Sequence, residues 1–127
     1  MTVVGIGTDL VDIDRMRSII SRRPRFVQRV FTEAERQYCS QTRDPSERYA
    51  ARFAAKEAVL KTLGVGLGGA DFADIEVVRL DSGQPMLRIT GRAAELAARQ
   101  GIDRWLITLS HSENLAQAFV VGLAGNE

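Results

Sequence analysis

Glu57 is the side chain of this sequence that most needs a chemical explanation. Helical spacing places its carboxylate among apolar neighbours, which are Tyr49, Ala50, Phe53, Ala54 and Leu60. A charged group seldom enters a core without a partner, so Glu57 requires a cation, a hydrogen-bond network or a metal. Lys61, one helical turn further on, offers an ordinary i,i+4 ion pair. The spacing leaves the ion pair and the metal equally open.

Asp9 has a similar profile, because it is predicted to end an apolar strand and to precede a helix that begins near Asp12. Its ordinary role would be in a turn or a helix cap. Together with Glu57, however, it would supply two hard oxygen ligands without a histidine or cysteine partner. Such a pair suits magnesium (Mg2+), completed by water and substrate phosphates, better than zinc.

His111 is the only histidine, and it is predicted to lie in a connection between strands, beside Ser110 and Ser112. The more common fate of a single histidine is a hydrogen-bonded place in the core. This position also allows a contact with phosphate. Cys39 is the only cysteine, which excludes an intrachain disulfide and predicts a packed, unreactive thiol.

The segment Gly5-Ile6-Gly7 begins like a dinucleotide-binding fingerprint but does not complete one. Leu10 stands where the third glycine would have to be, and no acidic residue ends a following strand at the right distance. We therefore reject that interpretation. Glycines inside a strand more often permit close backbone packing, which we favour here over contact with a ligand.

Six arginines follow one another without an acid between them and create a local positive field. They are Arg15, Arg17, Arg22, Arg23, Arg25 and Arg29. A solvated helix face is the ordinary explanation of such a run. Only Phe26 is interleaved with these arginines, so a nucleic-acid surface is less persuasive.

The composition bounds the class of protein. The chain has 127 residues, 45% hydrophobic and 26% charged, which predicts one folded domain over residues 1–127. No apolar run approaches the roughly 20 residues that a membrane helix needs. The first twelve residues lack the basic start and cleavage site of a signal peptide, so we expect a cytoplasmic protein with no membrane partner.

The elements that must position these residues alternate between helix and strand. Local signals include the Thr32–Glu35 capping box, Asp44 before Pro45 at the start of the longest helix, and Gly64 as its left-handed cap. A first helix is expected from about residue 12, and Pro24 should end or bend it. Further helices are expected at 32–39, 45–63 and 92–100. Strands are expected at 2–9, 75–80, 85–89, 105–110 and 115–123, with a hairpin turn at 81–84. This order predicts an α+β fold with an antiparallel sheet packed with helices and one long central helix.

Three blocks, taken together, resemble the holo-acyl-carrier-protein synthase family of 4'-phosphopantetheinyl transferases. They are Gly5–Val11, Arg52–Ala58 with Lys61, and Leu109–Ser112. The resemblance spans residues 2–123 and includes Phe31–Glu35 and the Gly83-Gln84-Pro85 turn. It implies the 4'-phosphopantetheinyl transferase-like fold. Relatives vary after Ser110-His111, where this chain reads Ser112-Glu113-Asn114.

The resemblance also implies a site for coenzyme A. Asp9 and Glu57 would hold magnesium against the pyrophosphate, and Lys61 would touch the phosphates. Arg52, the turn formed by Gly83, Gln84 and Pro85, and His111 would help to hold the 3'-phosphorylated adenosine diphosphate portion. Asp9, Glu57 and Lys61 are then the catalytic residues, with Asp9, acting directly or through water, as the preferred general base.

The implied reaction moves 4'-phosphopantetheine from coenzyme A to a serine of apo acyl carrier protein in fatty acid biosynthesis, giving the holo carrier and 3',5'-ADP. The arginine helix, through Arg15, Arg22 and Arg25, would dock the acidic carrier. The family further implies a homotrimer with its sites between subunits. Two other functions fit the same residues: a non-catalytic module that binds an acidic protein, and a nucleotide pyrophosphatase that releases phosphopantetheine to water.

Overall fold

Eleven elements make up the computed structural model, which describes residues 1–66 and 68–125. They are five strands, five α-helices and one short 3₁₀ helix, η1. In chain order they are β1 (Thr2–Asp12), α1 (Ile13–Arg22), α2 (Pro24–Val30), α3 (Glu33–Cys39), α4 (Ser46–Leu63), η1 (Phe72–Asp74), β2 (Ile75–Arg79), β3 (Pro85–Ile89), α5 (Gly91–Arg99), β4 (Arg104–His111) and β5 (Leu115–Ala124).

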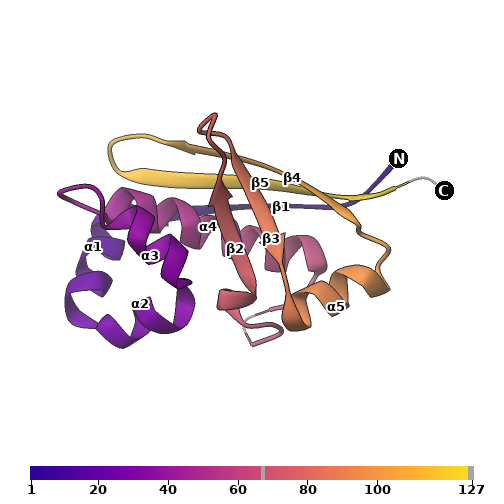
Figure 1. Cartoon of the computed structure of the whole chain (residues 1–127), viewed down its shortest axis with the longest axis horizontal. Helices are drawn as coiled ribbons and strands as arrows, with labels where there is room; N and C mark the ends of the chain where they lie inside the picture. Colours follow the sequence, from indigo (N-terminus) through magenta and orange to yellow (C-terminus); the bar gives the residue numbers. More distant parts are fainter. Residues whose placement is uncertain (67, 126–127) are drawn as a thin grey trace.

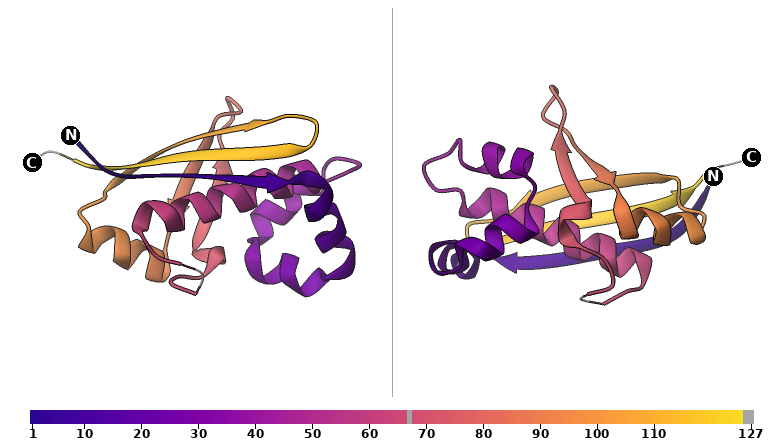
Figure 2. Two further views of the ribbon diagram at one scale, coloured as in Figure 1. Left: turned by 180° about the vertical axis from the view of Figure 1, so that it is seen from behind. Right: turned by 60° about the horizontal axis from the view of Figure 1, so that its bottom comes forward.

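The strands form two antiparallel sheets that pack with α4. The larger sheet has the order β1-β5-β4, and β2 pairs with β3 as a separate hairpin. Figure 1 shows α4 lying along the larger sheet, with α1, α2 and α3 gathered at one end of the molecule and α5 at the other. The views in Figure 2 show the same layering. The predicted α+β class, antiparallel sheet and long central helix are confirmed.

The contact between β1 and α4 depends on glycine. A β-carbon added to Gly7 would lie 2.1 Å from the carbonyl oxygen of Ala58, and one added to Gly5 would lie 2.7 Å from that of Thr62. Neither position has room for a side chain, so the backbone of β1 lies in direct contact with the backbone of α4. Close packing, the role we favoured for these glycines, is confirmed.

Several element ends differ from the expected ones. The strand expected to end at Asp9 continues to Asp12, because β1 pairs with β5 as far as Asp12 opposite Leu115. Asp9 therefore lies inside a strand. Pro24 does not merely end α1; it occupies the first turn of a separate helix, α2, which local patterns did not predict.

The end of α4 has its predicted cap, whereas at its start Pro45, and not Asp44 as expected, is the N-cap residue. The helix begins at Ser46, one residue later than expected, and Asp44 Oδ1 accepts a hydrogen bond from the Ser46 backbone N–H at 3.0 Å. Hydrogen bonds from Ser46, and then from Arg17, hold the pKa of Asp44 down at about 2. Gly64 ends the helix with φ of +74°, the predicted left-handed cap.

The core lies on both sides of α4. One buried cluster joins α4 to the inner face of the large sheet and to the hairpin, and a second joins it to α1, α2 and α3. Cys39 belongs to the second cluster, and burial raises the pKa of its thiol to about 12, so the packed-thiol prediction is confirmed. Among the described helices, none is long and apolar enough to cross a membrane.

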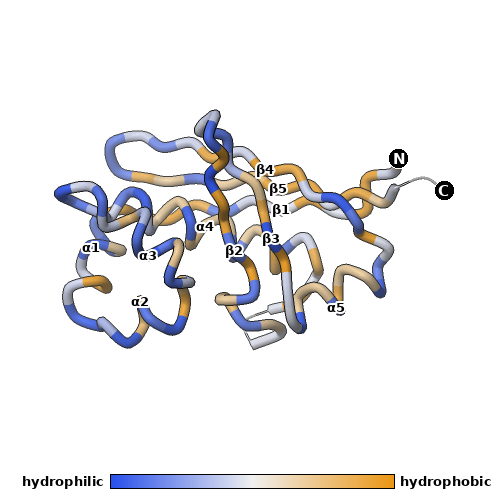
Figure 3. The backbone as a smooth tube through the Cα atoms, in the orientation of Figure 1, coloured by the Kyte–Doolittle hydropathy of each residue, from blue (hydrophilic) through white to orange (hydrophobic). Residues whose placement is uncertain are grey.

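The outer face of the large sheet leaves apolar side chains exposed. Strand alternation turns Gly5, Gly7 and Asp9 toward α4 and the residues between them away from it. Several large hydrophobic residues on β1, β4 and β5 are at least 40% exposed, among them Ile6, Leu10, Leu106, Leu115 and Phe119. Figure 3 shows hydrophobic residues distributed along the three strands.

Replacing Gly7 by alanine should destabilise the protein, because the new methyl group collides with the backbone of α4. We expect the free energy of unfolding to fall by about 1–3 kcal/mol. Gly66→Ala is the matched control, since nothing lies within 4 Å of its added β-carbon. Urea denaturation of both variants measures the difference. Equal stability of the two would contradict the proposed strand–helix contact.

Candidate active site

Asp9, Glu57 and Lys61 come together where β1 crosses α4. Asp9 follows Gly7 on the strand face that is turned toward the helix. Lys61 Nζ lies 3.0 Å from Asp9 Oδ1 and donates a second hydrogen bond to the carbonyl oxygen of Thr8 at 2.9 Å. Glu57 and Lys61 on α4 therefore lie close to Asp9 on β1.

The ion pair between Glu57 and Lys61, which the spacing had left open, is not the one that forms. Lys61 pairs with Asp9, and no ion pair within 4.0 Å involves Glu57 in the described part of the chain. Glu57 is half-buried. Burial raises the pKa of its carboxyl group, the negative charge of Asp9 raises it further, and Lys61 opposes both. Two carboxylates thus repel each other across a partly covered site.

A divalent cation fits this arrangement. It would relieve the repulsion between Asp9 and Glu57 and would receive two hard oxygen ligands. Among residues 1–66 and 68–125, no group of three or more His, Cys, Asp or Glu side chains is placed to hold a metal. A site with only two protein carboxylates suits magnesium, which keeps water or substrate phosphates as its other ligands.

A cleft of about 340 Å³ extends from Glu57 toward α1 and α2. Its walls are mainly apolar, with Met16, Ile19 and Phe53 among them, and Arg15 lies at its edge. The carboxylate pair is therefore linked to the arginine helix by a continuous surface.

A second region gathers three arginines around one aromatic ring. The guanidinium groups of Arg48, Arg52 and Arg79 lie 4.0, 4.3 and 5.7 Å from the centre of the Tyr38 ring. Within the described residues none of these arginines has an acidic partner within 4.0 Å. Arg52 is buried, and its Nε has no hydrogen-bond partner. Uncompensated cations and an orphaned donor mark a place for an anion.

The hairpin turn completes this second region. Tyr38, Arg52, Arg79, Gly83 and Pro85 line one cavity of about 230 Å³. Gln84 is exposed at the turn. The structure thus brings Arg52 to the turn, as the sequence led us to expect. Sequence reasoning missed Tyr38, Arg48 and Arg79, because no motif or spacing links residues on three separate elements.

His111 lies elsewhere. It is the last residue of β4 and not part of the connection, and its side chain is 48% exposed, so the prediction of a core histidine is wrong. The end of an edge strand leaves the ring in solvent. Its Nε2 lies 3.5 Å from Oε2 of Glu47, near the start of α4. Glu47 is ten residues, or about 15 Å along the helix axis, from Glu57. A single chain does not bring His111 to the carboxylate pair.

The arginine helix has the predicted amphipathic form. Ile13 and Met16 are buried, whereas Arg15 and Arg22 are exposed. Arg25 is exposed too, but it lies on α2 and not on the same helix as expected, because α1 ends at Arg22 and a new helix begins at Pro24. Arg17 differs from the others because it pairs with Asp14 and Asp44. Its charge is therefore balanced locally, and the remaining arginines supply the positive field.

Known proteins share this fold and sequence over nearly the whole chain. The 4'-phosphopantetheinyl transferase superfamily matches residues 5–120. A holo-[acyl-carrier-protein] synthase of Desulforudis audaxviator is 45% identical, covering 98% of this chain and 96% of that protein. One from Methylorubrum extorquens is 49% identical, covering 94% and 92%.

Solved structures agree with these sequence relatives. A holo-[acyl-carrier-protein] synthase from Neisseria meningitidis has a TM-score of 0.85 at 32% identity, covering 96% of this chain and 99% of that one. The Bacillus anthracis enzyme, in complex with coenzyme A (3',5'-ADP), has a TM-score of 0.82 at 32% identity, covering 98% and 100%. The expected fold is confirmed, and the chain belongs to the 4'-phosphopantetheinyl transferase superfamily.

Proposed function

We propose that this protein transfers 4'-phosphopantetheine from coenzyme A to a serine of apo acyl carrier protein and releases 3',5'-ADP. The observation that carries the proposal is the meeting of Asp9, Glu57 and Lys61 in a chain of this superfamily. Its relatives include enzymes named holo-[acyl-carrier-protein] synthase, and a structural neighbour was solved in complex with coenzyme A. Fatty acid biosynthesis and the cytoplasm are the proposed setting.

The chemistry needs positioning and charge neutralisation more than a covalent nucleophile. Asp9 and Glu57 would hold magnesium, which supplies positive charge against the pyrophosphate when bound. The carrier serine oxygen forms a bond to the β-phosphorus, and the bond from that phosphorus to the bridging oxygen breaks. Lys61 can balance negative charge on the leaving 3',5'-ADP.

Asp9 is our candidate for the general base that takes the serine proton. Lys61 bonds to its Oδ1, whereas its Oδ2 has no hydrogen bond within the described contacts. That oxygen is available to a hydroxyl group that enters from the open side of the site. The carboxylate would accept the proton as the new phosphate ester forms.

The 3'-phosphorylated adenosine diphosphate portion would occupy the cavity beside Arg52 and the Gly83–Pro85 turn. The three uncompensated guanidinium groups around Tyr38 support this assignment, because a guanidinium group can donate two hydrogen bonds to one phosphate and balance its charge. Gln84 is accessible at the turn. His111 remains a proposed contact. It lies beside Glu47, at the opposite end of α4 from the carboxylate pair, which is consistent with a site shared between two copies.

A homotrimer is the proposed assembly. The exposed apolar outer face of the β1-β5-β4 sheet, represented by Ile6, Leu106 and Phe119, offers a surface that further copies of the chain would cover. Sites between subunits would then be completed by residues such as His111.

Glu57→Gln should abolish magnesium-dependent transfer while keeping the fold. The amide preserves shape but removes an anionic ligand, and we expect the rate to fall about 100-fold or more. Intact mass of apo acyl carrier protein, incubated with coenzyme A and magnesium or a chelator, provides the measurement. Glu95→Gln, an exposed change on α5, is the control. Full activity of Glu57→Gln would refute the metal assignment, and phosphopantetheine released to water would indicate a pyrophosphatase.

The carboxyl group of Glu57 should titrate above the ordinary glutamate value of 4.5, because burial and the charge of Asp9 raise its pKa. The folded protein therefore holds the Glu57 proton more tightly than the unfolded chain does. As a consequence, the free energy of unfolding should fall as the pH rises from 4.5 through the raised pKa of Glu57. Carboxyl NMR of metal-free protein measures the midpoint, and added magnesium should lower it. A midpoint at or below 4.5 would show that the two carboxylates do not repel.

Charge reversal on the arginine helix should weaken docking of the acidic carrier. For Arg15→Glu or Arg22→Glu we expect the KM for carrier to rise several-fold, and more at low salt because salt screens exposed charges. Arg99→Glu makes the same charge change on α5 and should leave that KM unaltered. Steady-state kinetics at two salt concentrations tests this, and an unchanged KM in the α1 variants would exclude the docking role.

A further inference from the structure

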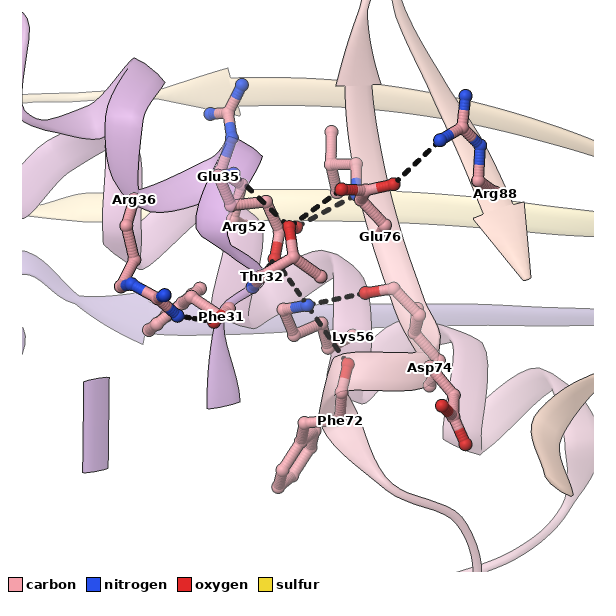
Figure 4. A network of polar contacts seen from close by, with 12 residues as sticks. Phe31, Thr32, Glu35, Arg36, Arg52, Lys56, Phe72, Asp74, Glu76 and Arg88 are labelled. Carbon is pink, nitrogen blue, oxygen red and sulfur yellow. Dashed lines mark hydrogen bonds and ion pairs between the residues drawn. The ribbon is translucent and has the colours of Figure 1, made fainter. Parts of the chain in front are cut away.

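Lys56 is the neighbour of Glu57 on α4, yet its side chain is completely buried. Its Nζ lies 2.8 Å from Oε1 of Glu35, which is also buried. The same ammonium group donates hydrogen bonds to the carbonyl oxygens of Phe72, at 3.0 Å, and Ile75. All three of its donors are therefore used, as Figure 4 shows.

Stability alone does not account for this ion pair. Burial lowers the pKa of Lys56, and the charge of Glu35 and its hydrogen bond, followed by the charge of Glu76, counteract that effect only in part. Well-packed apolar residues are often as stabilising as a buried pair of this kind. What distinguishes the pair is the backbone that it contacts.

The β2–β3 hairpin is a two-stranded sheet, so the outer edge of β2 pairs with no described strand. Thr90 donates its backbone N–H to the Asp74 carbonyl oxygen, and Leu80 donates to that of Gln84. Even-numbered residues of β2 therefore direct their backbone groups toward β3. The backbone groups of the odd-numbered residues point to the open edge.

The ion pair occupies that open edge. The carbonyl oxygen of Ile75 accepts from Lys56, and the backbone N–H of Val77 donates to Glu35 Oε2 at 2.9 Å. These two groups are consecutive outward-facing groups of β2. One side chain provides the donor and the other the acceptor, as an adjacent strand would.

Further hydrogen bonds tie the same edge to α3 and across the hairpin. Glu35 Oε1 accepts the backbone N–H of Thr32 at 2.9 Å, and the Thr32 hydroxyl donates to Glu76 at 2.7 Å. Glu76 in turn lies 3.4 Å from Arg88 on β3. Figure 4 shows these contacts as one network. The base of the hairpin is thereby fixed to both α3 and α4.

We propose that Lys56 is a positioning residue of the transfer reaction: with Glu35 it fixes the hairpin so that Arg79 and the Gly83–Pro85 turn stand against Arg52. Arg52 lies four residues before Lys56, so both project from one face of α4. The inference rests on the proposed function, because the cavity between Arg52 and the turn is our proposed nucleotide site.

The test is the double variant Lys56→Met/Glu35→Leu, which removes the pair without leaving an unpaired charge. Amide hydrogen exchange should show lost protection at Val77 and along β2 and β3. The KM for coenzyme A should rise about tenfold or more. The kcat at saturating coenzyme A should change much less, because Asp9, Glu57 and Lys61 are untouched.

Ile102→Ala is the control for general destabilisation. Ile102 is 5% exposed and approaches Gly122; it shares the apolar cluster of α4 and the hairpin but contributes no side-chain hydrogen bond to the hairpin network. It should lower the melting temperature without changing the KM for coenzyme A. A folded double variant with unchanged KM, or with unchanged exchange at the hairpin, would overturn the positioning role. A rise in KM of the same size in Ile102→Ala would also overturn it.

A milder variant serves if the double variant does not fold. Glu35→Asp keeps both charges but withdraws the carboxylate from Lys56 and Val77 because the side chain is one methylene shorter, and it should raise the KM for coenzyme A several-fold with little effect on kcat. An unchanged KM would overturn the proposal. Lack of transfer by the wild-type protein would instead contradict the proposed function, since amide exchange at the hairpin reports on the ion pair without any substrate.

Discussion

The backbone contact between β1 and α4 is the constraint on which the rest of the structure depends. Gly5 and Gly7 bring the strand to within van der Waals distance of the helix carbonyl groups, and Asp9 follows on the same face. A larger residue would push the strand outward and separate Asp9 from Lys61 and Glu57. The glycines would therefore act on the proposed chemistry indirectly, by fixing the position of Asp9 relative to Glu57 and Lys61.

Helix α4 then distributes its residues between two tasks. Glu57 and Lys61 face the strand that carries Asp9, whereas Arg52 and Lys56 face the hairpin. The residues of each pair are four positions apart, and the two pairs are offset by five, so one rigid helix relates both regions of the proposed coenzyme site. Phosphoryl transfer gains most from fixed positions and balanced charge, so a rigid central helix suits the proposed reaction.

Local signals predicted much of this framework. The Thr32–Glu35 capping box, the Gly64 cap and the β2–β3 hairpin all formed, since each depends on neighbouring residues. The length of β1 was not predictable locally, because pairing with β5 decides it. The separate helix α2 was missed because Pro24 signals an interruption as readily as a new start.

Contacts between distant elements account for what the sequence concealed. Asp9 and Glu57 were singled out as isolated carboxylates, but only the folded chain shows that Lys61 pairs with Asp9. Lys56 has the spacing of an ordinary helical lysine, and nothing local predicts that it is buried against Glu35. The arginine cluster around Tyr38 likewise depends on tertiary packing.

A crystal structure with coenzyme A and manganese as a detectable substitute for magnesium tests the central claim most directly. The claim is that the two faces of α4 hold one coenzyme molecule. We predict an anomalous metal peak between the carboxylates of Asp9 and Glu57, beside the pyrophosphate. The 3'-phosphorylated adenosine should lie against Arg52 and the hairpin turn. Metal or nucleotide bound away from both faces would contradict the account.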